Sequence, residues 1–451
     1  MGRLFGTDGV RGIANKELTV KLAYKLGVAG GYVLGQNITG RRPMVLIGRD
    51  TRISGEMLED AISAGLLSTG CDVIKVGEIP TPGVAFLTRE MDASAGVVIS
   101  ASHNSFEYNG IKFFNSKGFK LEDEIEEEIE NIILSDKDVN SNITGALVGR
   151  IIEKKEDALK KYTNYLENSV DTNLKGMKIV LDCANGAAYK AAKIVFDALG
   201  AKTVVIGDKP DGLNINEGYG STYPDKMQKR VVKEKADIGM AFDGDADRLI
   251  AADEKGELID GDRIMYICAK MMHKEGSLDK NLLTATTMSN IGLEEALKKC
   301  KIKMQRADVG DRYVLEMMQK TGSVLGGEQS GHVIFLNGNT TGDGIYAALR
   351  LLEAITKSKK KASELASEVK EYPQVLKGAK VKNENKYSFD KDEKIAKAIT
   401  ELEESMKGKG RVIIRPSGTE PLVRVMIEGE DKQKISKMAD KLVKLIEERL
   451  R

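Results

Sequence analysis

Short apolar runs, each followed by a polar loop, recur along the first half of the chain. Four of these loops begin at Gly48, Ser100, Asp182 and Asp243. Short apolar runs that stop at such loops are typical of strands buried on both faces of a sheet. Helical spacing separates the runs, as over residues 122–134, where isoleucines form one stripe. The pattern predicts an α/β fold and puts the loops at the carboxyl ends of strands, where such sheets bind ligands.

The last segment of the chain has a different pattern. Apolar residues stand at every second position from Val423 to Ile427, which predicts a strand with one buried face. Helical spacing follows from Ile435 to Leu445. This segment is therefore expected to be a small α+β unit.

The length of the chain and its polar stretches indicate several domains. A chain of 451 residues holds about three domains at roughly 150 residues each. Joins are expected near residue 155, in the charged turn 253–256, and in 358–373, where a lysine-rich helix ends at a proline. The predicted domains are 1–155, 156–254, 255–370 and 371–451. We expect the first three to follow one α/β plan and the fourth to be the smaller α+β domain.

Composition narrows the functional classes. Lys and Arg number 69 against 68 Asp and Glu, so the net charge of +1 gives no reason to expect a nucleic acid or an acidic membrane as the main partner. The 4 cysteines are far apart and include no CxxC pair, which argues against a disulfide scaffold or a zinc finger and suits a reducing cytosol. No apolar run approaches the roughly 20 residues that cross a bilayer. A cytoplasmic protein is expected.

The loop after the second apolar run contains a candidate nucleophile. Ser102 is followed by His103 and, further along, by Lys112. A serine in such a loop can act as a nucleophile or carry a phosphate when cations and donors lie close by. Taken alone, the pair of serine and histidine fits a polar loop with a capping serine better.

Three carboxylates alternate in the loop that begins at Asp243. Asp243, Asp245 and Asp247 are turned by a glycine, and Arg248 follows them. Oxygen ligands without cysteine or histidine favour Mg²⁺ or Ca²⁺ over Zn²⁺. Arg248 stands where an EF-hand loop needs glycine, and a solvated acidic turn is the remaining alternative. Crowding of like charges favours the metal site.

Two later turns carry ligand-binding groups. The turn 326–332 combines a carboxylate, an amide, a hydroxyl and an imidazole, which suits a ligand rich in hydroxyls, although an ordinary turn is the simpler reading. The turn 415–421 combines a guanidinium, two hydroxyls and glycine, which suits a phosphate. The candidate residues are Glu328, Ser330 and His332 in the first turn and Arg415, Ser417, Gly418, Thr419 and Arg424 in and beyond the second.

Arginines also occupy two glycine-containing turns. Arg11 lies in the turn 6–12, and Arg312 lies in the turn 310–312. Without further context, we interpret both as salt-bridged structural turns.

Taken together, in this order and at these separations, the serine loop, the aspartate loop and the C-terminal turn resemble the α-D-phosphohexomutase superfamily over essentially the whole chain. The segments 5–12 and 327–332 resemble its glucosamine branch. The resemblance implies four domains around a central cleft: three similar mixed-sheet α/β domains and a smaller C-terminal α+β domain. It also implies an isomerase that interconverts glucosamine 6-phosphate and glucosamine 1-phosphate through a phosphoserine and a 1,6-bisphosphate, and so supplies UDP-N-acetylglucosamine for cell-wall precursors.

The resemblance also assigns roles. Ser102 would be the phosphorylated serine and, with the three aspartates, would hold one Mg²⁺. Arg11, His103 and Lys112 would surround the transfer site. The sugar phosphate would be bound by Arg248, Glu328, Ser330 and His332, and its distal phosphate by Arg415, Ser417, Gly418, Thr419 and Arg424. A hexose 1,6-bisphosphate activator and a homodimer are further expectations.

Two positions depart from the superfamily pattern, and other functions stay open. Ser105 replaces a usual proline, which removes a fixed φ angle from the serine loop, and Tyr219 stands where cysteine is common. The rivals are a phosphomannomutase or phosphoglucomutase with the same machinery, a sugar phosphatase with Asp243 as nucleophile, and a sensor without turnover.

Overall fold

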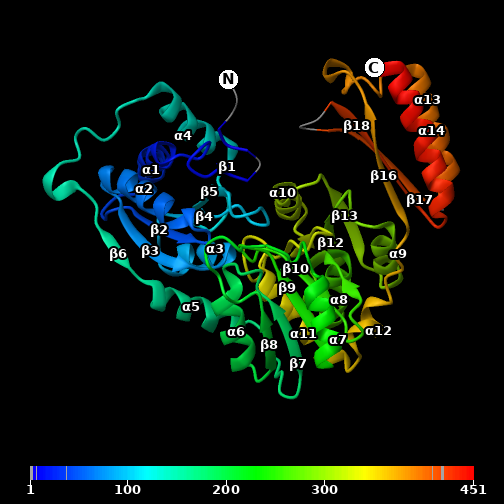
Figure 1. Ribbon diagram of the computed structural model, residues 1–451, viewed down its shortest axis with the longest axis horizontal. Coiled ribbons are helices and arrows are strands. Elements are labelled where there is room, and N and C mark those ends of the chain that lie inside the picture. Colours follow the sequence, from blue (N-terminus) through cyan, green and yellow to red (C-terminus); the bar gives the residue numbers. More distant parts are fainter. Residues whose placement is uncertain (1–3, 7, 37, 409, 418–420) are drawn as a thin grey trace. The chain divides into compact units, whose positions relative to one another are not determined.

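The computed structural model describes residues 4–6, 8–36, 38–408, 410–417 and 421–451. The chain forms two compact units (Figure 1). The larger unit consists of Met1–Met288 and Lys301–Ser367, and the smaller unit consists of Ser289–Cys300 and Glu368–Arg451.

The first sheet of the larger unit has six strands. In sheet order these are β1 (Val10–Ile13), β5 (Tyr108–Asn115), β4 (Ala95–Ile99), β2 (Met44–Arg49), β3 (Asp72–Glu78) and β6 (Ile151–Glu153). Strands β4, β2, β3 and β6 are parallel, whereas β5 is antiparallel to β4 and β1 is antiparallel to β5. Central strands such as β4 are fully buried, because helices cover both faces.

Two groups of helices cover this sheet. Helices α1 (Val20–Gly35), α2 (Ser54–Ser68) and α4 (Asp123–Ser135) pack together, and their apolar residues share one core cluster with the strands (Figure 1). Helix α3 (Thr81–Glu90) packs on β2 and β4, and α5 (Lys155–Glu167) packs on β3.

The second sheet has five strands. In sheet order these are β11 (Leu258–Ile259), β10 (Leu249–Ala252), β9 (Ile238–Phe242), β7 (Lys178–Asp182) and β8 (Lys202–Ile206). Strands β9, β7 and β8 are parallel, while β10 and β11 continue as antiparallel strands. Helices α6 (Ala188–Ala198) and α7 (Asp225–Glu234) pack on it. The charged turn 253–256 connects β10 to β11 within this sheet.

The third sheet repeats the plan with four strands. In sheet order these are β13 (Lys303–Ala307), β12 (Leu282–Thr286), β14 (Leu325–Gly327) and β15 (Val333–Phe335), of which only β15 is antiparallel. Its helices are α8 (Gly261–Glu275), α10 (Asp311–Thr321), α11 (Gly344–Ser358) and the short α12 (Ala362–Ala366). All three sheets thus combine parallel strands with an antiparallel edge, the mixed sheets that the resemblance implies.

The smaller unit is an antiparallel sheet with helices. In sheet order its strands are β16 (Gln374–Lys380), β18 (Leu422–Gly429) and β17 (Gly410–Pro416). Its helices are α9 (Ile291–Lys299), α13 (Glu393–Met406) and α14 (Lys432–Leu450). Val423, Val425 and Ile427 of β18 are buried in one core with Ile435 and Leu442 of α14. The predicted α+β unit is confirmed.

Among the described residues, no helix is both long enough and apolar enough to span a bilayer.

Candidate active site

The serine loop begins at the carboxyl end of β4. Ser102 is buried, with 2% of its surface exposed, and its backbone is left-handed, with φ at 50°. Its hydroxyl donates a hydrogen bond to Asp243 Oδ2 over 2.6 Å. His103 lies on the same loop, with Nδ1 3.4 Å from Ser102 Oγ. The candidate nucleophile and the first aspartate therefore meet, although 141 residues separate them in sequence.

The aspartate loop begins at the carboxyl end of β9, as the sequence predicts. Asp243, Asp245 and Asp247 are all buried, and each offers an oxygen within 4.8 Å of the others. Burial, followed by the charges of Asp247 and Asp245, raises the pKa of Asp243 well above its usual range. Crowding of this kind is stabilised by a bound cation.

The donor set fits a magnesium ion. Asp245 Oδ1 and Asp247 Oδ1 are buried and lack a hydrogen-bond partner among the described residues. A buried carboxylate oxygen without a donor is costly, and all three ligands are oxygen atoms, the type that Mg²⁺ prefers. Other oxygens of the triad already accept hydrogen bonds. Asp245 Oδ2 accepts from the Thr81 hydroxyl at 2.7 Å, and Asp243 Oδ1 accepts from the Arg248 amide at 3.2 Å.

Lys112 lies on β5, the antiparallel neighbour of β4, and its side chain reaches the aspartate loop. Its ammonium lies 3.2 Å from Asp245 Oδ2 and 2.9 Å from Asp8 Oδ2. Burial alone would lower the pKa of Lys112, but the charges of Asp8 and Asp245 raise it above the usual value. Arg11 of β1 forms an ion pair with the same Asp8. Lys112 is thus held as a cation beside the reacting serine.

His103 is placed to accept a proton. Burial, and then the positive charges of Arg248 and Arg11, lower the pKa of His103 below its ordinary value. The imidazole is therefore neutral at pH 7. Arg248 itself is kept charged, because Asp247, Asp243 and Glu328 raise its pKa despite burial.

The turn between β14 and β15 lies against the aspartate loop. An isolated bridge pairs Arg248 with His332. His332 Nε2 accepts a hydrogen bond from the Gly342 amide, so its ring proton is on Nδ1, which lies 3.5 Å from Asp247 Oδ2. Glu328 is half-buried and accepts from the Gly310 amide, and Ser330 is exposed. The structure thus brings Arg248, Glu328, Ser330 and His332 to one region of the larger unit.

The candidate phosphate-binding residues belong to the smaller unit. Arg415 of β17 and Arg424 of β18 are direct cross-strand partners. Ser417 is buried, and its amide donates to the Leu422 carbonyl at 2.8 Å. Gly418 and Thr419 lie outside the described residues. Two arginines at facing positions make a turn suited to an anion.

Models of all four domains of one protein family match the chain. Models of the phosphoglucomutase/phosphomannomutase domains I, II, III and IV match residues 2–140, 160–256, 260–372 and 376–445. The chain belongs to the phosphoglucomutase/phosphomannomutase family.

Curated relatives and solved structures agree with the family assignment. A phosphoglucosamine mutase of Alkaliphilus metalliredigens is 54% identical over 450 residues, and one of Clostridium acetobutylicum is 55% identical over 449; each match covers 100% of both chains. A phosphoglucomutase/phosphomannomutase family protein from Burkholderia thailandensis has the same fold, with a TM-score of 0.81 at 24% identity over 100% of this chain and 98% of the other.

Several residues around the serine and aspartate loops were not predicted from the sequence. Asp8 binds Lys112 and also Lys120, and Lys120 continues to Asp311. Thr81, at the start of α3, binds Asp245 through both its hydroxyl and its amide. Asp8 and Asp311 lie in the two turns that were interpreted as salt-bridged, and the ion pairs confirm that interpretation.

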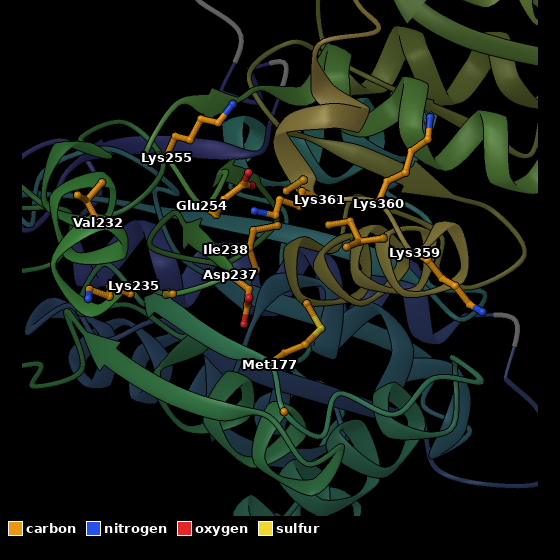
Figure 2. Close-up of a pocket in the computed structure, with 14 residues that line it drawn as sticks. Met177, Val232, Lys235, Asp237, Ile238, Glu254, Lys255, Lys359, Lys360 and Lys361 are labelled. Atoms are coloured by element: carbon orange, nitrogen blue, oxygen red, sulfur yellow. The ribbon is translucent and has the colours of Figure 1, made fainter.

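A hollow of about 520 Å³ lies at the end of β9 opposite the aspartate loop, where Ile238 begins the strand (Figure 2). Its rim is rich in lysine, which suggests an anion site. Figure 2 shows, however, that the ammonium groups of Lys235, Lys255, Lys359 and Lys360 point outward in different directions. Because a phosphate needs converging donors, this hollow does not resemble a second phosphate site.

Proposed function

We propose that this chain interconverts glucosamine 6-phosphate and glucosamine 1-phosphate, the reaction of a phosphoglucosamine mutase. One observation carries the proposal: the Ser102 hydroxyl lies 2.6 Å from a buried aspartate triad, in a chain that matches curated phosphoglucosamine mutases over its full length. A phosphate on Ser102 would lie beside Asp243, Lys112 and His103. A buried site also keeps water from the phosphoserine.

The reaction has two phosphoryl transfers. In the first, the bond between phosphorus and Ser102 Oγ breaks while O1 of the 6-phosphate bonds to phosphorus; the O1 proton passes to a base, and Ser102 Oγ takes a proton. The resulting 1,6-bisphosphate turns over in the cleft. In the second, Ser102 Oγ bonds to the phosphorus at C6 while the bond from that phosphorus to O6 breaks; the Ser102 proton passes through the base to O6, and glucosamine 1-phosphate leaves. Such transfers depend on alignment and charge neutralisation.

The groups around Ser102 supply both requirements. Asp243, Asp245 and Asp247, with Ser102, would hold Mg²⁺, which supplies positive charge to phosphoryl oxygens when bound. Lys112 adds a fixed cation on the same side. His103 is better suited than Lys112 to take the proton, because its pKa is lowered whereas that of Lys112 is raised.

Further parts of the proposal concern the rest of the chain. Arg415, Ser417, Gly418, Thr419 and Arg424 would hold the phosphate that is not reacting, and Glu328 and Ser330 would bind sugar hydroxyls, with Arg248 and His332 beside them. We also propose the four domains 1–155, 156–254, 255–370 and 371–451 around a cleft, a hexose 1,6-bisphosphate activator, and a cytoplasmic homodimer. Four free cysteines support a reducing compartment.

A coupled assay with glucosamine 6-phosphate and Mg²⁺, run before and after priming with a hexose 1,6-bisphosphate, tests the proposal. We expect glucosamine 1-phosphate to form and mass spectrometry to find the phosphate on Ser102. Ser102→Ala should lose turnover entirely. Ser105→Ala, on the exposed part of the same loop, is the matched control and should stay active.

Other outcomes identify the rivals. Faster turnover of mannose or glucose phosphates would indicate a phosphomannomutase or phosphoglucomutase. Release of inorganic phosphate without isomerisation would indicate a phosphatase, and binding without turnover would indicate a sensor. Full activity in Ser102→Ala would refute the phosphoserine role.

A further inference from the structure

The backbone at Ser102 is held in an unfavourable conformation. A φ of 50° lies in the left-handed region, which a non-glycine residue adopts only where its surroundings enforce it. Position 105, three residues later, is a serine and not a proline, so no ring fixes φ there and stiffens the loop. Other contacts must therefore hold the loop in place.

Arg52 makes the first set of contacts. Its side chain is fully buried, and its guanidinium donates hydrogen bonds to four backbone carbonyls of one loop. Nη2 reaches the carbonyls of Ser102 and Asn104, each at 2.9 Å, while Nη1 binds those of Ser105 and Tyr108. The planar guanidinium has its donors in a fixed fork, so four contacts define the loop's shape.

Asp50 fixes this arginine and extends the network to the Ser102 amide. Asp50 Oδ2 accepts from Arg52 Nε at 2.8 Å and from the Ser100 hydroxyl at 2.5 Å. The Ser100 hydroxyl oxygen in turn accepts from the Ser102 amide at 3.0 Å. Both polar groups of the Ser102 backbone are therefore tied to the end of β2.

Asn216 makes the second set of contacts, from the loop that follows β8. Its Nδ2 donates to the Ser102 carbonyl at 2.9 Å and to the Asn104 carbonyl at 3.0 Å, the same two oxygens that Arg52 Nη2 reaches. Asn216 is 3% exposed, and its amide is bonded to the Ala184 carbonyl. Its position is thus set by the second sheet, which also carries the aspartate triad.

The two loops are also in close contact at Gly244, between the first two aspartates. A Cβ on Gly244 would lie 2.6 Å from the Ser102 carbonyl oxygen and 2.8 Å from Asn216 Nδ2. Only glycine allows this approach. A small shift of the serine loop would therefore change its distance from the aspartates directly.

We propose that Arg52 and Asn216 are positioning residues for phosphoryl transfer, one from each side, that lock the Ser102 backbone against the aspartate loop. The inference rests on the proposed function, because it assigns these side chains to the phosphoserine of that reaction. A misplacement of about 1 Å in such a site costs about 100-fold in rate. The clamp therefore acts on kcat through Ser102 without touching the substrate.

Asn216→Asp and Asn216→Ala together test the clamp. Aspartate matches asparagine in shape, but it replaces the NH₂ donor with an oxygen that faces two carbonyl oxygens. We expect kcat to fall about 10-fold in Asn216→Ala and about 100-fold in Asn216→Asp, with KM changed less than about 3-fold. Lys209→Ala, on the exposed part of the same loop, is the matched control and should keep the wild-type kcat.

Amide hydrogen exchange over residues 100–108 gives a readout that does not need turnover. We expect faster exchange there in Asn216→Asp than in Asn216→Ala, and wild-type exchange in Lys209→Ala. Arg52→Lys keeps the charge but not the fork of donors. It should lower kcat and speed amide exchange at residues 100–108, as Asn216→Asp does.

The outcomes separate the two proposals. Failure of the wild-type enzyme to isomerise glucosamine 6-phosphate would sink the proposed function, whereas the exchange experiment would still report on the clamp. If Asn216→Asp matches the wild type in kcat and in exchange, or changes KM alone, the clamp is wrong while the mutase reaction stands. A uniform loss of stability without faster exchange at residues 100–108 would also contradict it.

Discussion

Each aspartate of the triad has different hydrogen-bond partners, and the oxygens without a donor are the ones that a bound ion would satisfy. Asp243 accepts from Ser102, Asp245 from Thr81 and Lys112, and Asp247 lies beside His332. One oxygen each of Asp245 and Asp247 is buried without a hydrogen-bond donor among the described residues. A cation would satisfy both oxygens and offset the repulsion between three buried charges.

Mg²⁺ is therefore expected to stabilise the folded protein, with or without substrate. A ligand at 100 times its Kd adds about 2.7 kcal/mol, which is a shift of several degrees in Tm. Asp245→Asn removes one ligand charge, so most of this shift should disappear. Thermal unfolding with EDTA and with increasing Mg²⁺ measures it.

Asp182→Asn is the control for that titration. Asp182 is fully buried at the end of β7, and one of its oxygens has no hydrogen-bond partner in the described part of the chain, but it is not part of the triad. Its variant should keep the wild-type response to Mg²⁺. An equal response in Asp245→Asn would show that the ion binds elsewhere.

Residue type and spacing revealed some of the site but not all of it. Ser102 and the aspartates stand in loops with recognisable composition, and Lys112 follows the serine loop closely, so they could be named from the sequence. Asp8, Thr81 and Lys120 act through contacts with residues far along the chain, such as the 164 positions between Thr81 and Asp245. Nothing local marks a threonine or a lysine for such a contact.

Elements with strong periodicity were predicted well. The helix expected over 122–134 is α4 (Asp123–Ser135), and the alternation at 423–427 falls within β18 (Leu422–Gly429). The strand β5 (Tyr108–Asn115) was not predicted, although it carries Lys112. It starts with exposed Tyr108, and its place is set by antiparallel pairing with β4 and β1, which the local pattern does not encode.

At the level of elements, α5 is joined to α11 through one buried hydrogen bond. The Tyr162 hydroxyl donates to Asp343 Oδ2 at 2.9 Å, and Asp343 caps α11 by accepting from the Tyr346 amide. Asn339 also donates to Asp343 Oδ2. Behind this cap, the Gly344 amide donates to the Ala246 carbonyl in the aspartate loop. The cap of α11 thus supports the metal site from behind.

Burial raises the pKa of Asp343 from 3.8 to about 6. A carboxyl whose pKa rises on folding favours the folded state fully below pH 3.8, and this contribution is lost as the pH rises through 6. Above pH 6 the folded protein holds a buried carboxylate that depends on its donors. Tyr162→Phe should therefore destabilise the protein by about 2 kcal/mol at pH 7.5, but by about 1 kcal/mol at pH 5. Urea unfolding at both pH values measures the difference.

Tyr165→Phe is the matched control on the same helix. The Tyr165 hydroxyl is buried without a hydrogen-bond partner among the described residues, and its ring stacks on Phe86 at 4.2 Å between centroids. Its removal should change stability little at either pH. A loss in Tyr162→Phe that is the same at pH 5 and pH 7.5 would contradict the role given to ionised Asp343.

On the scale of the molecule, charged side chains join the first and third sheets of the larger unit. Lys120 lies between Asp8 Oδ1, at 2.6 Å, and Asp311 at the start of α10. Burial lowers the pKa of Lys120, but the charges of Asp311 and Asp8 more than offset it and raise the pKa above its usual value. Arg312, beside Asp311, reaches Asp123 of α4 at 2.6 Å. The contacts of Lys120 with Asp8 and Asp311 are largely buried, and the contact between Arg312 and Asp123 is more exposed.

This difference in burial predicts unequal contributions to stability. Lys120→Met leaves two carboxylates close together without their shared cation, so it should lower the free energy of unfolding by about 2–3 kcal/mol. Arg312→Met breaks a pair whose aspartate is 44% exposed, and it should cost less than about 1 kcal/mol. Water and salt screen exposed charges more strongly than buried ones. In 0.5 M NaCl, the stability loss of Arg312→Met should therefore shrink further, while most of the loss of Lys120→Met should remain. Urea unfolding of both variants at low and high salt gives the comparison, and equal losses would mean that Lys120 does not join the two sheets.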